Sequence, residues 1–303
     1  MRIILTISSF FIFCGLFAQH TPLVGHYLNN QMPLNPGFTG YQGSPEVNLS
    51  FRKQWMKLEG SPNTQLLSYS TRFKDDKNAI GFIMSRDEIG ISSSFGFNAS
   101  YAHVFKLTKT LNWSLGAAAG IQSLRNNWSL INTTDPNDLA FMLPSSSLIA
   151  PYASFGTVLF NKKFFVSLSV LNLITSVQKG ASLETGSDFA NHTYYMGGGF
   201  KHTINADLDL NYGLLVKYHQ VAPIQADVTI SAEYKQMFKG GVSYRSGDAL
   251  ILLVGYNVNQ QFSIGYQYDL TLSALAPYNS GSHEINLRYL FKFYHYTANP
   301  QFF

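Results

Sequence analysis

The chain has 303 residues and a formal net charge of +4, and only 13% of its residues are charged while 46% are hydrophobic and 15% aromatic. Soluble domains carry about 25% charged residues, so this composition argues against a soluble globular protein. The near balance of charge, without any Lys/Arg-rich run, excludes a nucleic-acid-binding surface. Few charges, many aromatic residues and 24 glycines instead suit an all-β protein whose outer face meets lipid.

The N-terminus has the pattern of a secretory signal. Arg2 supplies the positive charge, residues 3–17 form the apolar stretch, and Ala18 is the small residue before the expected cut. Cys14 leaves a lipoprotein signal as the alternative. Because Cys14 is the only cysteine, we predict a signal peptide over residues 1–18 and a mature chain without disulfides.

Residues 19–45 form an irregular N-terminal segment with prolines and glycines at short intervals. The segment is too broken for a strand and too aromatic for a free linker. We expect it to pack in or under the mouth of a barrel, either as a plug or as a periplasmic lead-in.

From Glu46 onward, nearly every segment alternates apolar and polar residues, as in Ser282–Tyr294. Strict alternation predicts strands with one apolar and one polar face. Fourteen such segments are predicted, over residues 46–56, 64–73, 78–86, 93–106, 110–123, 148–160, 163–174, 192–203, 207–219, 224–235, 238–246, 249–258, 261–270 and 282–294.

The predicted links alternate in length along the chain, and this decides between a sandwich and a barrel. Tight polar turns are expected at 74–77, 107–109, 161–162, 205–206, 236–237 and 259–260. Longer links are expected at 57–63, 87–92, 124–147, 175–191, 220–223 and 271–281, with 246–248 as the one short member of that set. A β-sandwich has no reason to alternate loop length, whereas outer-membrane barrels have short periplasmic turns and longer outer loops.

The prediction is therefore an all-β fold, a closed antiparallel transmembrane β-barrel of about fourteen strands over residues 46–294, with a periplasmic tail over residues 295–303. No later apolar stretch reaches the ~18 residues that a membrane-spanning helix needs. A charge on the lipid face costs about 2–4 kcal/mol at the midplane, so the charged residues are expected to face the lumen. They are Arg52, Arg72, Lys217, Asp227, Glu233, Arg245, Asp269, Glu284 and Arg288. Mixed charges favour a filled or plugged lumen over a selective pore.

No set of residues predicts catalysis, a metal site or a cofactor. Ser282, His283 and Glu284 are adjacent, but neighbours on a strand point to opposite faces and cannot form one triad. The eight histidines are scattered without a metal-binding spacing. The acidic pairs at 75–76 and 87–88 are interpreted as solvated turns. We expect neither an enzyme nor a cofactor.

Several long motifs resemble one known family. They are NPGFTG (35–40), FRKQW (51–55) with SPNTQ (61–65), DPNDLAF (135–141), YRSGDA (244–249) and IGYQYDLTLSALAPYNSGSHEINL (264–287). Together with the residues between them, they make the mature chain similar from end to end to the PorP/SprF membrane proteins of the type IX secretion system in Bacteroidetes.

The resemblance implies a non-enzymatic outer-membrane barrel that supports the export or surface anchoring of cargo or adhesin proteins, including adhesins of gliding motility. Its implied partners are outer-membrane lipid, the periplasmic ring subunits of the secretion system, and a secreted surface adhesin or the C-terminal domain of one. The alternative function is a passive outer-membrane channel or a transporter of hydrophobic solutes.

The same motifs supply the residues expected to bind a partner or to pack the loops. We expect Arg245 and Asp248 to flank a tight turn that holds the long loop 271–281 across the mouth; closing the barrel seam is the alternative role. The full set is Arg52, Trp55, Arg245, Ser246, Gly247, Asp248, Asp269, Tyr278, Asn279, Ser280, Gly281, His283 and Glu284.

Overall fold

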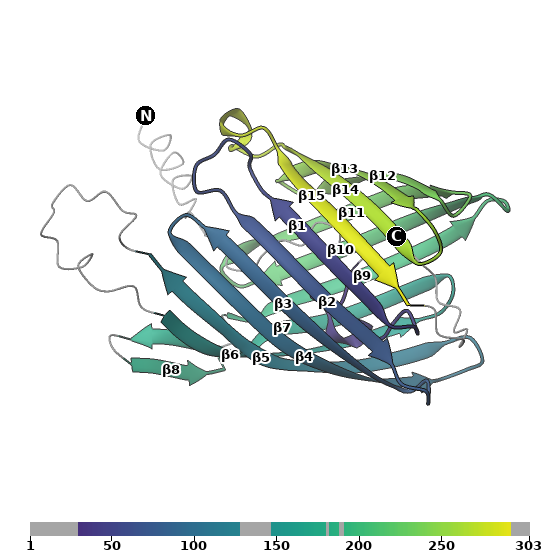
Figure 1. The fold of residues 1–303 in the computed structure, drawn as a ribbon, viewed down its shortest axis with the longest axis horizontal. Coiled ribbons are helices and arrows are strands. Elements are labelled where there is room, and N and C mark those ends of the chain that lie inside the picture. Colours follow the sequence, from purple (N-terminus) through teal and green to yellow (C-terminus); the bar gives the residue numbers. More distant parts are fainter. Residues whose placement is uncertain (1–29, 128–146, 180–181, 188–190, 292–303) are drawn as a thin grey trace, which may run out of the picture.

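The computed structural model describes residues 30–127, 147–179, 182–187 and 191–291 (Figure 1). Its strands are β1 (Glu46–Lys53), β2 (Asn63–Arg72), β3 (Asn78–Ile89), β4 (Ser92–Lys106), β5 (Asn112–Asn126), β6 (Ser147–Phe160), β7 (Phe164–Lys179), β8 (Ser182–Gly186), β9 (Thr193–Thr203), β10 (Leu208–His219), β11 (Ala222–Tyr234), β12 (Phe238–Arg245), β13 (Ala249–Asn257), β14 (Phe262–Thr271) and β15 (Ser282–Leu290). No helix in the described ranges is long and apolar enough to span a membrane.

Fourteen of these strands close into an antiparallel barrel, because β6 pairs with β7 and the first strand pairs with the last. The seam between β1 and β15 is in unbroken register, from Glu46 opposite Leu290 to Lys53 opposite His283. Only β8 lies outside the ring, where it extends β7 as a hairpin. The predicted closed barrel is therefore confirmed, and one strand in the link 175–191 was not predicted.

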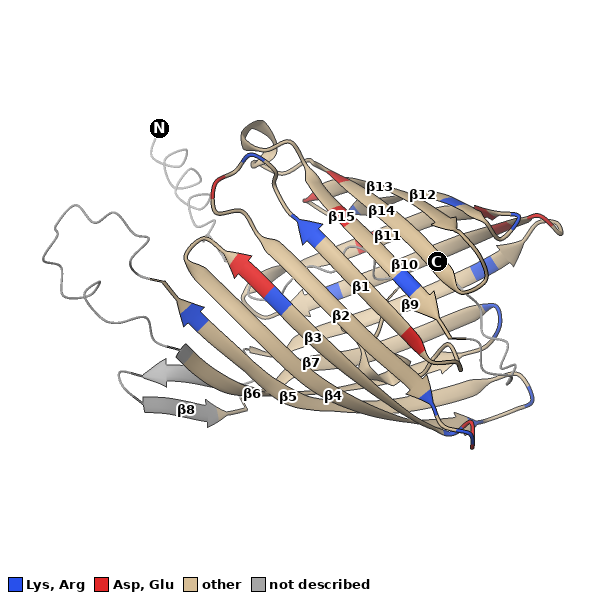
Figure 2. Cartoon of the chain, viewed as in Figure 1, with Lys and Arg blue, Asp and Glu red and all other residues tan. Residues whose placement is uncertain are grey.

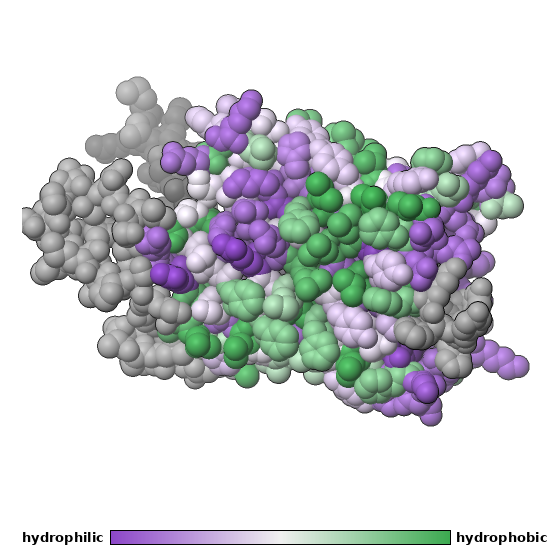
Figure 3. Space-filling view, in the orientation of Figure 1, coloured by the Kyte–Doolittle hydropathy of each residue, from purple (hydrophilic) through white to green (hydrophobic). Residues whose placement is uncertain are grey.

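The barrel has an apolar outer face and a polar inner face, as the alternation predicts. Along β11, for example, Val228 and Ile230 are exposed on the outside, while Asp227, Thr229 and Ser231 are buried inside. Figure 3 shows apolar side chains over the middle of the visible wall and hydrophilic ones towards its two ends. Charged residues on this face likewise lie towards the strand ends (Figure 2). This distribution suits a wall surrounded by hydrocarbon.

The two ends of the barrel differ in their connections. At the end that carries the start of β1, which we term the turn end, six short turns join the strands. At the opposite end, termed the loop end, the connections include the longer loops 54–62 and 272–281. Two of the predicted longer links are wrong, because β3 continues to Ile89 and β11 begins at Ala222, leaving connections of two residues.

The acidic pair at 87–88 was also placed wrongly, because both residues lie in β3. Asp87, predicted to lie in a solvated turn, is in β3, where its carboxylate is buried and accepts a hydrogen bond from the Thr64 hydroxyl. The inner wall of the barrel is polar, so an acidic side chain near a strand end can face inward as well as outward.

Residues 30–44 lie inside the wall and contain a short 3-10 helix, η1 (Pro36–Phe38), which contacts β4, β5, β6 and β7. The Asn35 side-chain amide donates to the carbonyl oxygens of Thr157 and Leu168, at 3.2 and 3.1 Å. The Thr39 hydroxyl donates to Ser100, at 2.8 Å. The segment is thus hydrogen-bonded to several strands of the inner wall.

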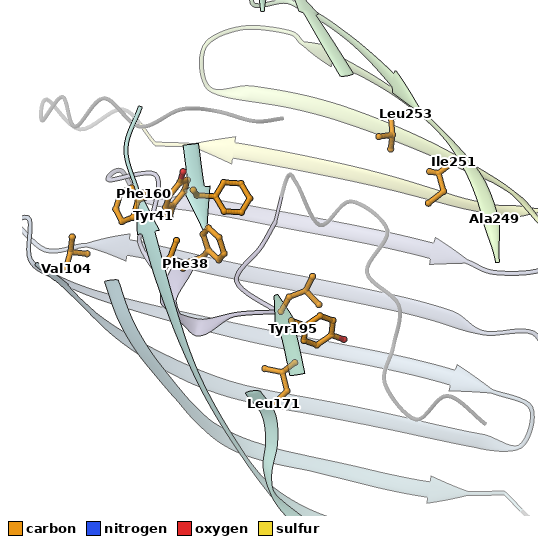
Figure 4. Packing of buried hydrophobic residues seen from close by; sticks show 12 residues of the cluster. Phe38, Tyr41, Val104, Phe160, Leu171, Tyr195, Ala249, Ile251 and Leu253 are labelled. Atoms are coloured by element: carbon orange, nitrogen blue, oxygen red, sulfur yellow. The ribbon is translucent and has the colours of Figure 1, made fainter. Parts of the chain in front are cut away.

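Apolar contacts add to these hydrogen bonds. Phe38 packs edge-on against Phe165, with ring centroids 5.4 Å apart, and Tyr41 packs against Phe160 at 4.8 Å. Figure 4 shows Phe38 and Tyr41 beside the aromatic residues of this wall, while Ile251 of β13 lies on the wall opposite. Buried aromatic pairs of this kind stabilise by about 0.5–1.5 kcal/mol beyond the area that they bury.

Candidate functional site

Buried charges on neighbouring strands form a continuous network near the loop end. Arg245 on β12 binds Asp227 on β11, with three nitrogen–oxygen distances of 2.8–3.1 Å. The two residues are direct partners in the register, and both side chains are at most 5% exposed. A guanidinium and a carboxylate in this bidentate arrangement form a strong, directional pair.

The network continues across the seam of the barrel. Arg52 on β1 donates to Asp269 on β14 at 2.7 Å and to Glu284 on β15 at 3.1 Å. The Ser50 hydroxyl donates to the second oxygen of Glu284, and the Gln267 amide donates to Asp269 at 2.5 Å. Because Arg52 joins the first strand to the last two, it ties the closing seam from the inside.

The turn 246–248 connects this network to the rim. Asp248 lies 3.7 Å from Arg245, and Gly247 has a φ of 69°, a left-handed conformation that favours glycine. Burial raises the pKa of the Asp248 carboxyl, and the positive charge of Arg245 offsets part of that effect. The Ser246 hydroxyl accepts a hydrogen bond from the backbone of Ala226. The turn is therefore held by contacts on both sides.

The loop 272–281 is bound to that turn through its backbone. The N–H groups of Leu272 and Ser273 both donate to the Asp248 carbonyl oxygen, at 2.7 and 3.3 Å. The expected contact between turn and loop is thus made by the Asp248 carbonyl, and its carboxylate faces Arg245 instead.

Asn279 organises the interior of the loop, which contains the 3-10 helix η4 (Ala276–Tyr278). Its side-chain oxygen accepts from the Thr271 hydroxyl at 2.9 Å and from the Gly281 N–H at 2.7 Å, and its amide donates to the Leu275 carbonyl at 2.5 Å. Gly281 has a φ of 87°. One side chain thereby fixes both ends of the loop.

A second loop lies against the first at the loop end (Figure 1). Ser280 N–H donates to the Met56 carbonyl at 2.9 Å, and Met56 N–H donates to the Gly281 carbonyl at 2.8 Å. Trp55 is half-buried and has a φ of 42°. Its backbone N–H donates to the Ser282 hydroxyl. Loops 54–62 and 272–281 therefore form one structure, which we term the loop-end rim.

The rim presents apolar side chains to its surroundings. Tyr278 is 68% exposed and Leu272 is 54% exposed, and Met56 beside them is also exposed. Ala274, Ala276 and Pro277 complete this apolar surface. A surface of this kind on a backbone held by many hydrogen bonds is typical of a preorganised protein-binding site.

His283 lies on the outside of the barrel, apart from its sequence neighbours. Its Nδ1 is 2.7 Å from the Tyr266 hydroxyl, while Ser282 and Glu284 are buried on the inner face. The three residues therefore do not converge on one reacting atom. Among the described residues, no group of three or more His, Cys, Asp or Glu side chains is placed to bind a metal ion.

Apart from His283, the predicted site residues fall into two connected groups. Arg52, Arg245, Asp269 and Glu284 meet in the lumen, while Trp55, Tyr278, Asn279, Ser280 and Gly281 belong to the rim, and Ser246, Gly247 and Asp248 join the two groups. Asp227, Gln267 and Met56 were not in the predicted set. Asp227 and Gln267 carry the right polarity for the inner face, but their partners depend on the register between strands. The motif DPNDLAF lies outside the described residues.

A small cavity lies between the N-terminal segment and the wall formed by β7, β9 and β10. Its volume is only about 20 Å³, and most of its lining is apolar, with Leu34, Phe38, Phe165, Tyr195 and Leu215 prominent. Ser167 and Ser169 supply polar groups at its wall.

Three solved structures illustrate the fold. The CymD monoaromatic hydrocarbon channel has a TM-score of 0.54 at 12% identity, covering 88% of this chain and 94% of that one. The Ralstonia pickettii toluene transporter TbuX has a TM-score of 0.52 at 12% identity, covering 87% and 94%. The P. putida toluene transporter TodX has a TM-score of 0.51 at 11% identity, covering 90% and 95%. At such low identity these similarities establish the barrel fold alone. None of the curated proteins matches the chain.

The sequence also matches one protein family over most of its length. Residues 16–289 match the family described as "Type IX secretion system membrane protein PorP/SprF". The matched range includes residues 30–44 inside the wall, the charged network and the loop-end rim. The chain therefore belongs to the PorP/SprF family of type IX secretion system membrane proteins.

Proposed function

We propose that this chain is a non-enzymatic outer-membrane component of type IX secretion that supports the export or surface anchoring of cargo proteins by docking them at its loop-end rim. The turn end then faces the periplasm, as the short turns of such barrels do. Gliding adhesins, or their C-terminal domains, are cargo of the kind expected. Periplasmic ring subunits of the system are the partners expected at the turn end.

The observation that carries the proposal is the rigid, apolar loop-end rim. Tyr278 and Leu272 remain exposed although the loop that carries them is fixed by Asn279 and Asp248. Because the loop is already ordered, it loses little conformational entropy when a partner binds to it. The buried network of Arg52 and Arg245 further supports a scaffold, since buried ion pairs hold the strands below the rim in place.

The proposal is tested by complementing a gene deletion with rim variants. Tyr278→Asp combined with Leu272→Asp should reduce surface display of a type IX cargo at least tenfold, while the barrel still assembles. Val258→Asp, which changes an exposed apolar residue in a turn at the other end, is the control. Normal display with the rim double variant would refute docking at the rim.

The cavity beside Phe38 and Phe165 favours a second candidate, a channel or carrier for small hydrophobic solutes. Its lining is mostly apolar, and the similar structures include transporters of toluene. Solute uptake into proteoliposomes, with unchanged cargo display in the deletion strain, would favour this candidate over a role in secretion.

A further inference from the structure

The turn end carries its net positive charge on one side. Three consecutive turns, joining β2 to β3, β4 to β5 and β6 to β7, contain or border six exposed lysines, which we term the basic arc. The basic arc consists of Lys74, Lys77, Lys106, Lys109, Lys162 and Lys163. The other three turns hold one exposed lysine, Lys235, and one exposed aspartate, Asp207.

The six lysines have no fixed acidic partners within the described part of the chain. The three turns that carry the arc contain two aspartates, Asp75 and Asp76. Asp75 accepts hydrogen bonds from the backbone N–H groups of Lys77 and Asn78, both at 3.0 Å. These bonds lower the pKa of the Asp75 carboxyl. Its charge is directed into its own turn, which leaves the ammonium groups of the arc available to an external anion.

Outward-facing aromatic residues place the basic arc at the edge of the hydrocarbon. Phe73, Phe105 and Trp113 are exposed at the ends of β2, β4 and β5, and the rings of Phe105 and Trp113 lie 5.3 Å apart. Aromatic residues of this kind gather where a membrane-spanning barrel meets the headgroups.

The turns themselves are short, so the lysines stay close to that level. Residues 161–163 are all that separates β6 from β7, and residues 107–111 separate β4 from β5. A lysine side chain is long and flexible, and it extends its ammonium group towards the interface while its methylenes remain on apolar surface. The ammonium groups of the lysines in these turns can therefore reach the layer of lipid phosphates beside the wall.

We propose that the basic arc binds the headgroups of anionic phospholipids in the leaflet at the turn end. The negative potential of a surface of anionic lipid attracts lysines close to it, and adjacent lysines act on the same headgroups. An acidic protein is the less favoured ligand, because the arc lies on short turns at the bilayer surface and forms no concave binding site among the described residues. The other three turns, whose exposed lysine and aspartate balance, carry no net charge to attract such headgroups.

Trp113 makes this proposal testable, because it is an exposed fluorophore within the aromatic border of the arc. The full chain carrying Trp55→Phe and Trp128→Phe, which leaves Trp113 as its only tryptophan, is reconstituted in phosphatidylcholine vesicles. Brominated phosphatidylglycerol, a quencher that acts at contact, is then added at a low mole fraction. Brominated phosphatidylcholine at the same mole fraction is the reference quencher.

We expect brominated phosphatidylglycerol to quench Trp113 severalfold more strongly than brominated phosphatidylcholine, and 0.5 M NaCl to reduce the difference because salt screens exposed charges. Changing Lys106, Lys109, Lys162 and Lys163 to Gln should abolish the difference, and changing them to Arg should preserve it. Lys235→Gln is the matched control and should leave it unchanged.

Equal quenching by the two lipids in the parent protein would overturn the proposal without any need for the lysine variants. If the lipids quench equally but the Gln variant loses a co-purifying acidic protein, the arc is a protein-binding surface and the lipid proposal is wrong. The proposal requires a barrel embedded in lipid, and it is independent of any role in secretion, so cargo display has no bearing on it.

Discussion

The guanidinium of Arg245 contacts both carboxylate oxygens of Asp227, through Nε at 3.1 and 3.0 Å and through Nη2 at 2.8 Å. The two residues face each other on β11 and β12. Moving two charges out of water is costly, so such a pair is tolerated only when the geometry of its hydrogen bonds is good. Removing one partner therefore leaves an uncompensated charge.

Arg245→Met should destabilise the barrel by about 3–5 kcal/mol, because it leaves the buried Asp227 carboxylate without its partner. The measurement is the urea midpoint of unfolding from lipid vesicles. Arg86→Met is the matched control, since Arg86 and Glu88 form an exposed pair on the outside of β3. Exposed pairs contribute about 0–1 kcal/mol. An equal loss in the two variants would show that the buried network adds nothing to stability.

Gly116→Ala should displace the N-terminal segment, residues 30–44, from the inner wall. A Cβ atom at Gly116 would lie 2.2 Å from the Pro36 carbonyl oxygen and 2.5 Å from the Gly37 nitrogen, and backbone atoms of η1 have no rotamer with which to move away. Thr39, almost fully buried, reports the change when it is replaced by cysteine in a Cys14→Ser background. We expect maleimide to label this cysteine at least tenfold faster in the Gly116→Ala variant.

Gly240→Ala is the control for that experiment, since a Cβ atom there meets nothing within 4 Å. It should leave the rate of labelling at position 39 unchanged. A Gly116→Ala variant that labels as slowly as its parent would mean that the segment is not seated against β5 as described.

Asn279→Ala should loosen the loop 272–281 without affecting the barrel. The substitution removes three hydrogen bonds inside the loop, each contributing about 0.5–1.5 kcal/mol. Hydrogen exchange should therefore become faster in the loop, while the strands keep their protection. Asn259→Ala, which removes the cap of a turn at the other end, should affect only that turn. Unchanged exchange in the loop would exclude Asn279 as its organiser.

Leu252→Arg should weaken assembly into the membrane by about 2–4 kcal/mol, because an arginine would then face hydrocarbon in the middle of β13. Leu252 is 48% exposed, and Leu272, just past the end of β14, is 54% exposed. Leu272→Arg should cost only about 0–1 kcal/mol, because it lies near the interface. Equal folding of the two variants in vesicles would contradict the assignment of the outer face to lipid.

Strand positions were predictable because the period of two persists through nearly the whole wall. The predicted strands 207–219 and 238–246 differ by one residue at one end from β10 and β12. The hairpin strand β8 was missed because Ser182–Gly186 has no alternation of apolar and polar residues. The two-residue connection after Ile89 was missed because the charged end of β3, with Asp87 and Glu88, resembles a loop. The one before Ala222 was missed because Pro223 at the start of β11 lacks a backbone N–H and argues against a strand.

The site was predictable in its members but not in its pairings. The motifs contain Arg52, Asp269 and Glu284, and parity places all three on the inner face. Which carboxylates meet Arg52 depends on how β1, β14 and β15 are aligned. A shift of two residues preserves every face and changes every partner. The role of the Asp248 backbone was beyond prediction, since any residue supplies the same carbonyl.

The position of Asn35 between β6 and β7, inside a wall that closes where β1 meets β15, sets the order in which the protein is built. Hydrogen bonds to Thr157 and Leu168 form at the inner surface of strands synthesised long after residue 35. Both bonds require β6 and β7 to lie side by side. The N-terminal segment therefore takes its final position only after the middle of the wall has formed.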